Sequence, residues 1–309
     1  MAVFAPAAKQ AALPPALLQE AWGGRLPLRF ALAQGEVTTL RSPSPFYAMG
    51  PRVSYLPVVA AAAVAFLRAS APDVVGGDEE QVWFEAGGRA LPWQLPLGVL
   101  YDALCERGEL PWAVTVHFRG YPSAELLACR GPATVSSHFF HAAKQGLCLR
   151  HGSCRVLMEL RKDYKTQLFE GVKAGDLGRY WGALQQLYSR GQPETVRVPV
   201  RLVQRAAAGG GGGGGGGDAG RPLLRTLQVP VPCKDERTGG AVTLGGALER
   251  LLLPAGRAAL EDIRAGGQRE GGARLLVAGV EAPPLDTPLV ELCAVLAHPD
   301  SWLYLVVAE

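Results

Sequence analysis

The feature that most restricts the fold of this chain is a β-rich plan that occurs twice. The first copy runs from Val82–Glu85 to Leu91–Leu97, and the second runs from Leu276–Glu281 to Leu285–Leu289. In each copy a closing strand follows about fifteen residues later. Because self-similar segments usually fold into similar units, the repeat predicts two β-rich domains of the α+β class.

The expected order within each copy is two strands, a helix, two short elements and a closing strand, which resembles the ubiquitin roll. In the whole first β-rich domain a short N-terminal helix comes first, and Pro57 is tolerated at the first turn of the next helix. The predicted elements of this domain are Leu17–Trp22, Leu28–Leu32, Glu36–Leu40, Arg52–Leu56, Val58–Arg68, Val82–Glu85, Leu97–Leu104 and Ala113–Phe118. Those of the second β-rich domain are Val196–Val203, Leu223–Val231, a helix capped by Thr243, Arg274–Val280, a helix from Leu289 and Trp302–Val307.

Between the two copies the apolar period becomes helical. After Gly131-Pro132, apolar residues recur every three or four positions until Pro193, which predicts three amphipathic helices. We therefore expect a disordered extension at 1–15, a first ubiquitin-like domain at 16–131, a helical domain at 132–193 and a second ubiquitin-like domain at 194–309. A polyglycine loop at 209–217 lies within the last domain.

The first central helix carries the candidate functional residue, Lys144, one of only six lysines in the chain. At about 100° per residue, one arc of this helix is apolar and the other is polar. The apolar arc holds Val135, Phe139, Phe140, Ala142, Ala143 and Leu147, and the polar arc holds Ser137, His138, His141, Lys144 and Gln145. The Lys144 amine is thus expected to point to water beside Phe140 and His141. Ser136 or Thr134 is expected to cap the helix, and Gly146 to loosen or end it.

Composition excludes several classes of protein. The 309 residues are 48% apolar and 19% charged, and the net charge of +3 is too small and dispersed for a nucleic-acid face. The longest apolar run, Leu56–Leu67, is too short to cross a bilayer, and the N-terminus lacks the pattern of a signal peptide. Six cysteines without a regular framework fit a reducing compartment, so we expect a cytoplasmic protein.

Several motifs, in the same order along the chain, resemble the autophagy-related protein 5 family. They are Trp22–Arg25, Pro51–Leu56, Val82–Glu85, Leu110–Phe118, His138-Phe139 with Lys144, Lys162-Asp163, and Gly279–Glu281 with Thr287–Leu289. The resemblance implies that Lys144 is joined by an isopeptide bond to the C-terminal glycine of a ubiquitin-like modifier, autophagy protein twelve. It implies a noncovalent coiled-coil partner, autophagy protein sixteen, whose N-terminal helix lies between the domains. It also implies an E3-like complex that promotes lipidation of autophagy protein eight with phosphatidylethanolamine on pre-autophagosomal membranes.

The chemistry of Lys144 agrees with this implied role. Attack on a thioester needs a neutral amine, and at pH 7 only roughly one lysine in 2,500 is neutral. Separate E1-like and E2-like enzymes would therefore supply the thioester, and arginine could not replace the lysine. The terminal residues, Val306–Glu309, lack a Gly-Gly end, so we expect an acceptor and not a modifier. We expect no catalytic residues, cofactor or metal site.

Three alternatives remain open from the sequence. The first is a zinc site among His138, His141, Cys148, His151 and Cys154, because zinc prefers imidazole and thiolate ligands. The second is a Cys148–His151 catalytic pair. The third is a noncovalent ubiquitin-fold scaffold in which Lys144 is incidental. The simplest interpretation of the cysteines and histidines is that the former pack in the helical core and the latter lie on its surface. The glycine tract lacks the Lys-Ser or Lys-Thr of a phosphate-binding loop.

Overall fold

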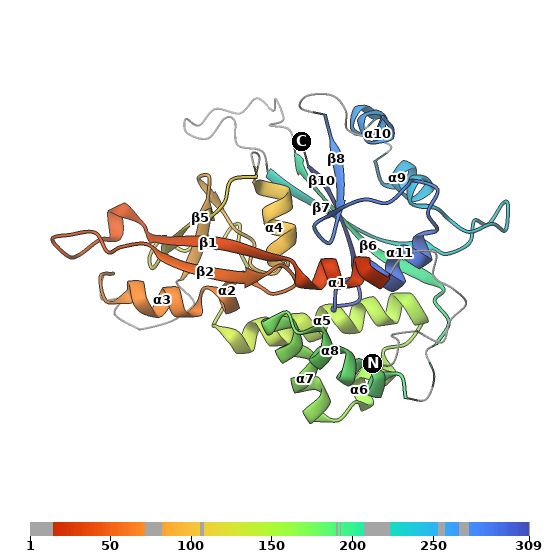
Figure 1. Ribbon diagram of the computed structural model, residues 1–309, viewed down its shortest axis with the longest axis horizontal. Coiled ribbons are helices and arrows are strands. Elements are labelled where there is room, and N and C mark those ends of the chain that lie inside the picture. Colours follow the sequence, from red (N-terminus) through yellow and green to blue (C-terminus); the bar gives the residue numbers. More distant parts are fainter. Residues whose placement is uncertain are drawn as a thin grey trace.

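The computed structural model describes residues 15–71, 82–105, 108–189, 191, 193–206, 223–252, 257–265 and 272–308. The polyglycine loop 209–217 and all of the predicted N-terminal extension except Pro15 lie outside these residues. The first β domain lies on the left of Figure 1, the second β domain on the upper right, and the helical domain beneath both.

The first β domain is a five-stranded sheet in the order β2-β1-β5-β3-β4. Strand β1 pairs antiparallel with β2 and parallel with β5. Its even-numbered side chains are buried against the helices, because successive side chains of a strand point to opposite faces. The strands are β1 (Arg25–Leu32), β2 (Phe46–Pro51), β3 (Trp83–Ala86), β4 (Arg89–Ala90) and β5 (Trp112–His117), and the helices are α1 (Pro15–Gly23), α2 (Leu56–Val59), α3 (Ala61–Arg68) and α4 (Leu97–Leu104).

The second β domain repeats this topology, with the strand order β7-β6-β10-β8-β9. Thr243 caps α9 as predicted, since its hydroxyl accepts a hydrogen bond from the Gly246 amide at 3.2 Å. The strands are β6 (Arg197–Ala206), β7 (Leu223–Pro232), β8 (Arg274–Val277), β9 (Val280–Glu281) and β10 (Leu303–Ala308), and the helices are α9 (Leu244–Leu252), α10 (Arg257–Arg264) and α11 (Leu289–Leu296). The matching topologies confirm the predicted repeat and the ubiquitin-like fold of both copies.

The helical domain contains four described helices, one more than predicted. They are α5 (Pro132–His151), α6 (Arg155–Glu159), α7 (Lys162–Ala174) and α8 (Leu177–Leu187). The apolar period through Leu157 and Leu168 predicted one helix, but Leu160 and Arg161 are extended and divide it into α6 and α7. Gly175, in the left-handed region, ends α7, and the Asp176 carboxylate accepts a hydrogen bond from the Arg179 amide to begin α8.

The second strand of the first β domain was predicted in the wrong place. Neither Glu36–Leu40 nor Arg52–Leu56 is a strand; Gln34–Glu36 form a single 3-10 turn, and the edge strand is Phe46–Pro51. The chain turns directly after this strand, where the Ser54 amide donates to the Pro51 carbonyl at 3.0 Å. The prolines before Phe46 indicated a turn, and the short strand that follows this turn was therefore not predicted.

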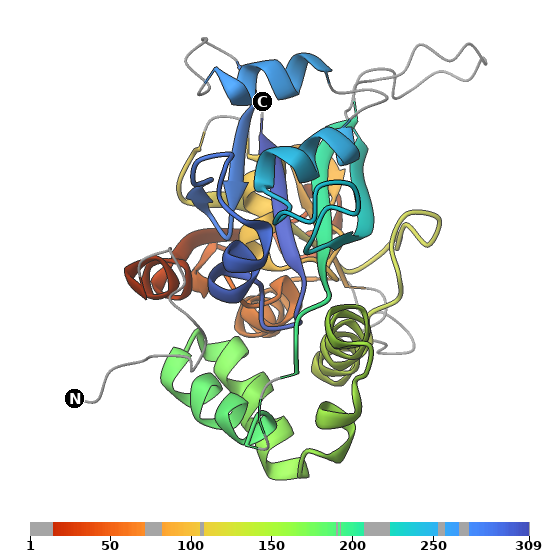
Figure 2. The ribbon, with the colours of Figure 1, turned by 90° about the vertical axis from the view of Figure 1, so that its right-hand side faces the viewer.

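The three domains share their apolar cores. Trp302 and Tyr304 of the second β domain belong to the core of the first, as does Ala142 of α5. Tyr55 and Trp93 of the first β domain belong in turn to the core of the helical domain. Figure 2 shows the green helices gathered at one end, against both sheets. The domains are therefore held in one arrangement by burial of side chains across their boundaries.

Candidate acceptor site and domain junction

The two ends of helix α5 are determined by a proline and a glycine, and not by the predicted hydroxyl caps. Pro132 occupies the first turn, where its missing amide hydrogen costs no helical bond, and Gly152 ends the helix in the left-handed region. Thr134 does not cap the helix; its hydroxyl accepts a hydrogen bond from the Arg130 amide at 3.2 Å. The cap position is Gly131, so the helix begins three residues earlier than a cap at Thr134 would place it, and five earlier than a cap at Ser136 would.

Gly146 does not loosen or end α5, contrary to the prediction. It is buried in the helix, and a Cβ built on it would lie 2.8 Å from the Ser301 Cβ and 2.9 Å from the Asp300 carbonyl oxygen. The glycine is required because the loop before β10 crosses α5 at this point. The contact fixes the helix against the second β domain, two residues from Lys144.

Lys144 lies on the side of α5 away from its buried face. The predicted apolar arc is confirmed, since Val135, Phe139 and Leu147 are buried and Phe140 is half-buried. Lys144 itself is half-buried, and its neighbour His141 is exposed. Among the residues that the structure describes, the amine has no hydrogen-bond or ion-pair partner. An amine in this position is accessible to a reactive group presented by another protein.

His138 departs from the predicted polar arc because its ring packs inward. It makes edge contacts with Trp93 at 5.4 Å and with Tyr55 at 6.4 Å between ring centroids. This burial lowers the pKa of His138 below its ordinary value, since it disfavours the charged ring. The histidine therefore serves as an aromatic contact between the helical domain and the first β domain.

The alternative zinc site is not assembled. Within the described parts of the chain, no group of three or more histidine, cysteine or acidic side chains is placed to hold a metal ion. His138 packs against the first β domain, whereas the His151 ring pairs with the Glu194 carbonyl at 3.0 Å, at the far end of α5. Two of the five proposed ligands, His138 and His151, therefore make separate contacts at different places along α5.

The alternative Cys148–His151 pair is not assembled either. No hydrogen bond links the two side chains among those of the described residues; the His151 Nδ1 pairs with the Glu194 carbonyl. The expectation that these cysteines pack in the helical core is wrong for Cys148, which is exposed, but holds for Cys154, which is half-buried and packs against that core. Of the two buried cysteines of the described chain, Cys129 belongs to the same core and Cys293 to the core of the second β domain.

A buried polar network at the base of β10 joins the domains. Asp300, with no exposed surface, accepts a hydrogen bond from the Tyr304 hydroxyl at 2.8 Å, which in turn accepts one from Arg201 at 2.5 Å. The His298 ring lies 3.0 Å from Asp300 and donates to the Val53 carbonyl of the first β domain at 2.9 Å. Burial alone would raise the pKa of Asp300, but His298, Arg201 and Tyr304 hold it below its ordinary value. The network keeps a charged carboxylate stable at the centre of the molecule.

The helical domain joins the same network through two further hydrogen bonds. The Trp302 indole donates to the Ala142 carbonyl of α5 at 3.1 Å, and the Tyr180 hydroxyl of α8 donates to the Pro299 carbonyl at 3.3 Å. The loop from His298 to Trp302 therefore contacts all three domains. These residues were not identified from the sequence, because nothing in their local pattern indicates a partner two hundred residues away.

Arg52 makes a second link between the β domains. Its guanidinium forms an ion pair with Asp102 of α4 and lies against the turn between β8 and β9. Gly279 in that turn has φ of +86°, and a Cβ there would lie 2.2 Å from the Arg52 Nε. Only glycine meets both the backbone conformation and the close approach.

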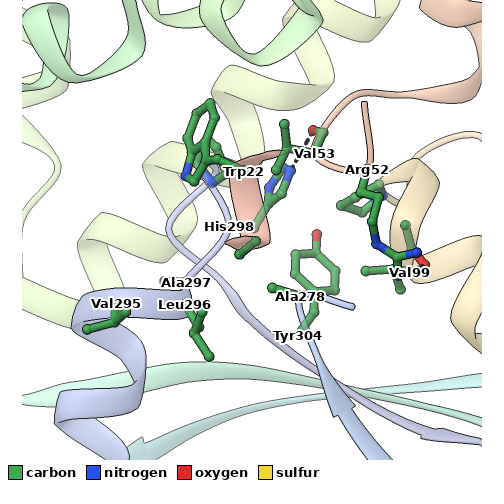
Figure 3. Close-up of a pocket in the computed structure, with 14 residues that line it drawn as sticks. Trp22, Arg52, Val53, Val99, Ala278, Val295, Leu296, Ala297, His298 and Tyr304 are labelled. Carbon is green, nitrogen blue, oxygen red and sulfur yellow. Dashed lines mark hydrogen bonds between the residues drawn. The ribbon is translucent and has the colours of Figure 1, made fainter. Parts of the chain in front are cut away.

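A small pocket opens beside these links, at the boundary of the two β domains (Figure 3). Its volume is about 40 Å³, and its walls come from α1, α4, α11 and the turn after β8. In Figure 3, Trp22, His298 and Tyr304 line it on one side and Arg52 and Val99 on the other. Because it is small and largely apolar, it suits a single apolar side chain of a partner and not a cofactor.

The fold and the junction define a protein of two ubiquitin-like domains fixed to a helical bundle. Three family models match consecutive parts of the chain: Autophagy protein ATG5, UblA domain, over residues 21–118, the alpha-helical bundle region of the same protein over 132–190, and its UblB domain over 197–307. The chain belongs to the autophagy protein 5 family. It is thus an autophagy protein, and the predicted fold class of two ubiquitin-like domains flanking a helical region is confirmed.

Comparison with individual relatives supports the same family. Autophagy protein 5 of Oryza sativa subsp. indica is 38% identical over 159 residues, which are 52% of this chain and 41% of that protein. The Arabidopsis thaliana protein is 31% identical over 212 residues, covering 60% and 62%, and the Aspergillus clavatus protein is 26% identical over 325 residues, covering 93% and 94%. The matches thus span less than two thirds of the rice and Arabidopsis proteins. The crystal structure of Kluyveromyces marxianus Atg5 shares the fold, with a TM-score of 0.71, 19% identity and coverage of 94% of this chain and 99% of that one.

Proposed function

We propose that this chain is the acceptor in a ubiquitin-like conjugation reaction of autophagy. Lys144 is joined by an isopeptide bond to the C-terminal glycine of autophagy protein twelve, with the thioester supplied by E1-like and E2-like enzymes. The observation that carries the proposal is the accessible Lys144 amine, which has no partner within the described residues and lies on a helix fixed at Gly146. A rigid helix holds the amine at one position, as attack on a bound thioester requires.

The conjugate acts as a scaffold in an E3-like complex. It promotes transfer of autophagy protein eight to phosphatidylethanolamine, and it works in the cytoplasm and peripherally on pre-autophagosomal membranes during autophagosome formation. None of the described helices combines the length and apolarity needed to cross a bilayer. Contact with a membrane is therefore assigned to the assembled complex and not to a spanning helix of the described chain.

The noncovalent partner of the complex is autophagy protein sixteen, bound through its N-terminal helix. We place one apolar anchor of that helix in the pocket at the junction, where α1, α4 and α11 meet (Figure 3). A helix in a groove binds through apolar side chains spaced three or four residues apart. Val295 of α11 lines the pocket, whereas its neighbour Ala294 is exposed and does not.

Two variants of α11 test the partner site. Val295→Glu is expected to weaken binding of a synthetic peptide of the partner's N-terminal helix in titration calorimetry, because it places a charge in an apolar pocket. Ala294→Glu, a matched change one residue away, is expected to leave binding unchanged. Equal binding by both variants would contradict this site, and binding by Lys144→Arg protein is expected to equal that of the unaltered chain.

The acceptor is tested by immunoblot of the protein expressed in cells. The protein is expected to run as a species heavier by one modifier, stable to thiol reductants because the link is an amide. Lys144→Arg is expected to remove this species and to lower lipidation of autophagy protein eight. Lys162→Arg, Lys165→Arg and Lys173→Arg are the controls; Lys165 donates to the Met158 carbonyl at 3.0 Å and Lys173 pairs with Glu170 at 2.8 Å. A heavy species that persists in Lys144→Arg would refute the proposal and favour the noncovalent scaffold.

A further inference from the structure

Exposed apolar side chains gather along β2, the outer strand of the first β domain. Tyr47 and Met49 on this strand are 62% and 57% exposed, and Phe66 of the adjacent helix α3 is 49% exposed. The Phe66 ring lies 5.6 Å from the ring of Phe46, the first residue of the strand. Tyr47 and Met49 lie on one face of the strand, and Phe66 lies beside Phe46 on the other. Exposed apolar side chains on both faces of one strand indicate an interaction site.

The backbone of β2 is also open on its outer side. The Arg52 amide donates to the Gly24 carbonyl at 3.0 Å, and the register pairs Pro51 with Arg25 and Met49 with Pro27. Hydrogen-bonded and non-bonded pairs alternate in an antiparallel ladder. The amide and carbonyl groups of Tyr47 and Met49 therefore point away from β1. This register agrees with Pro27, which has no amide hydrogen to offer Met49. Within the described residues no hydrogen bond occupies these outward groups.

Most of the strand lacks the features that usually protect a sheet edge. Its sequence, Phe46–Pro51, holds no charged residue and has a proline only at its last position, whereas the equivalent strand of the second domain, β7, carries Arg225, Pro230 and Pro232. Charges and prolines on an edge prevent pairing with other chains. At its C-terminal end β2 is closed by the turn after α7, since a Cβ on Gly175 would lie 2.7 Å from the Pro51 Cβ. The open stretch is therefore short and centred on Tyr47 and Met49.

The charges around the open stretch are basic. Arg29 is the register partner of Tyr47, and Arg41 is exposed in the loop that precedes β2. Neither guanidinium has an ion-pair partner among the residues described, and β1, β2 and α3 contain no acidic residue. A second copy of this chain would bring like charges together, whereas an acidic segment would be attracted.

We propose that β2 binds an extended acidic peptide of a partner protein, which adds to the sheet as a sixth strand. The outward amides and carbonyls of Tyr47 and Met49 hydrogen-bond to the peptide backbone. Alternate apolar side chains of the peptide pack on Tyr47 and Met49 on one face and on Phe66 on the other, because successive side chains of a strand point to opposite faces. Its carboxylates lie beside Arg29 and Arg41.

The test uses a fluorescein-labelled peptide, Glu-Asp-Phe-Val-Val-Leu-Asp-Glu, and the full-length chain in fluorescence anisotropy. Tyr47→Glu places a negative charge on the edge beside the acidic peptide and is expected to weaken binding about tenfold or more. The matched control is Gln228→Glu, which places the same charge on an exposed position of the other edge strand and is expected to change nothing. Met49→Pro removes an outward amide without removing a bond to β1, and it is expected to abolish binding while the fold survives.

Two further measurements separate backbone pairing from simple attraction of charge. A peptide with N-methylated central amides is expected not to bind, and the bound unmodified peptide is expected to slow hydrogen exchange at the Tyr47 and Met49 amides. Binding that resists Tyr47→Glu and Met49→Pro, or that Gln228→Glu weakens equally, overturns the proposal. A concentration-dependent dimer in sedimentation, abolished by Tyr47→Glu, would show that the occupant is a second copy and would overturn it as well.

Discussion

Replacing two helical glycines by alanine is expected to change stability in opposite directions. Gly146 of α5 and Gly182 of α8 both lie inside helices, where alanine is favoured by roughly 0.5–1 kcal/mol. Gly182 is exposed, and a Cβ built there has no neighbour within 4 Å. Gly182→Ala is therefore expected to raise the free energy of unfolding by roughly the full amount of that preference.

Gly146→Ala meets a different environment. Its Cβ would lie under 3.0 Å from Ser301 and from the Asp300 carbonyl, and this loop cannot easily move. Two hydrogen bonds hold the loop. The Trp302 backbone amide donates to the Asp300 carboxylate at 3.1 Å, and the Ser301 backbone amide donates to the His298 carbonyl at 2.8 Å. Overpacking typically costs about 1–3 kcal/mol. After subtracting the helix preference, a net loss on the order of 1–2 kcal/mol is expected.

Urea unfolding followed by circular dichroism measures both changes. Purified unaltered, Gly146→Ala and Gly182→Ala proteins are compared at one pH, and a shift in midpoint at constant slope reports stability. The expected signs are a lower midpoint for Gly146→Ala and a higher one for Gly182→Ala. If Gly146→Ala stabilises the protein as much as Gly182→Ala does, the close packing of α5 against the loop before β10 is wrong.

Three further predictions concern the junction and the loop. Gly279→Ala is expected to lower the melting temperature and to weaken the contact between the β domains, because the new Cβ displaces Arg52; a melting temperature equal to that of the unaltered chain would contradict this. The pKa of Asp300 is lower in the folded than in the unfolded chain. The ionised carboxylate therefore stabilises the fold at pH values above its unfolded pKa near 4, and this stabilisation is lost as the pH falls through the folded pKa. Asp300→Asn is expected to cost about 3–5 kcal/mol at pH 7 in urea unfolding and to flatten the loss of stability in acid; an unchanged acid profile would exclude this role. Shortening the glycine tract Gly209–Gly217 to about three residues is expected to change stability by roughly 1 kcal/mol or less and to leave conjugation intact, as measured by unfolding and immunoblot.

Much of the fold was predictable because it depends on local periodicity. The strand Trp302–Val307 and the helix Leu97–Leu104 were placed within a residue of their ends, since a short apolar run and helical spacing are local properties. The repeat of one strand order in both β domains could be inferred from paired segments. The edge strand Phe46–Pro51 was missed because it is short and follows prolines.

The junction could not be predicted because its contacts link residues far apart in the sequence. Gly146 was predicted to loosen or end the helix, since a sequence alone does not reveal the Asp300 and Ser301 backbone that crosses it. His138 was placed on the polar face for the same reason, as its partners Tyr55 and Trp93 lie in another domain. The amphipathic pattern did predict the exposed side of α5 on which Lys144 lies.

The most direct test of the account is to locate the covalent link in the heavy species. The conjugate is purified from cells under denaturing, reducing conditions, digested with trypsin and analysed by tandem mass spectrometry. The account predicts one branched peptide, in which the Lys144 amine carries the C-terminal residues of autophagy protein twelve and trypsin has not cleaved after Lys144. A branch at any other lysine, or a heavy species with an unmodified Lys144, would contradict it.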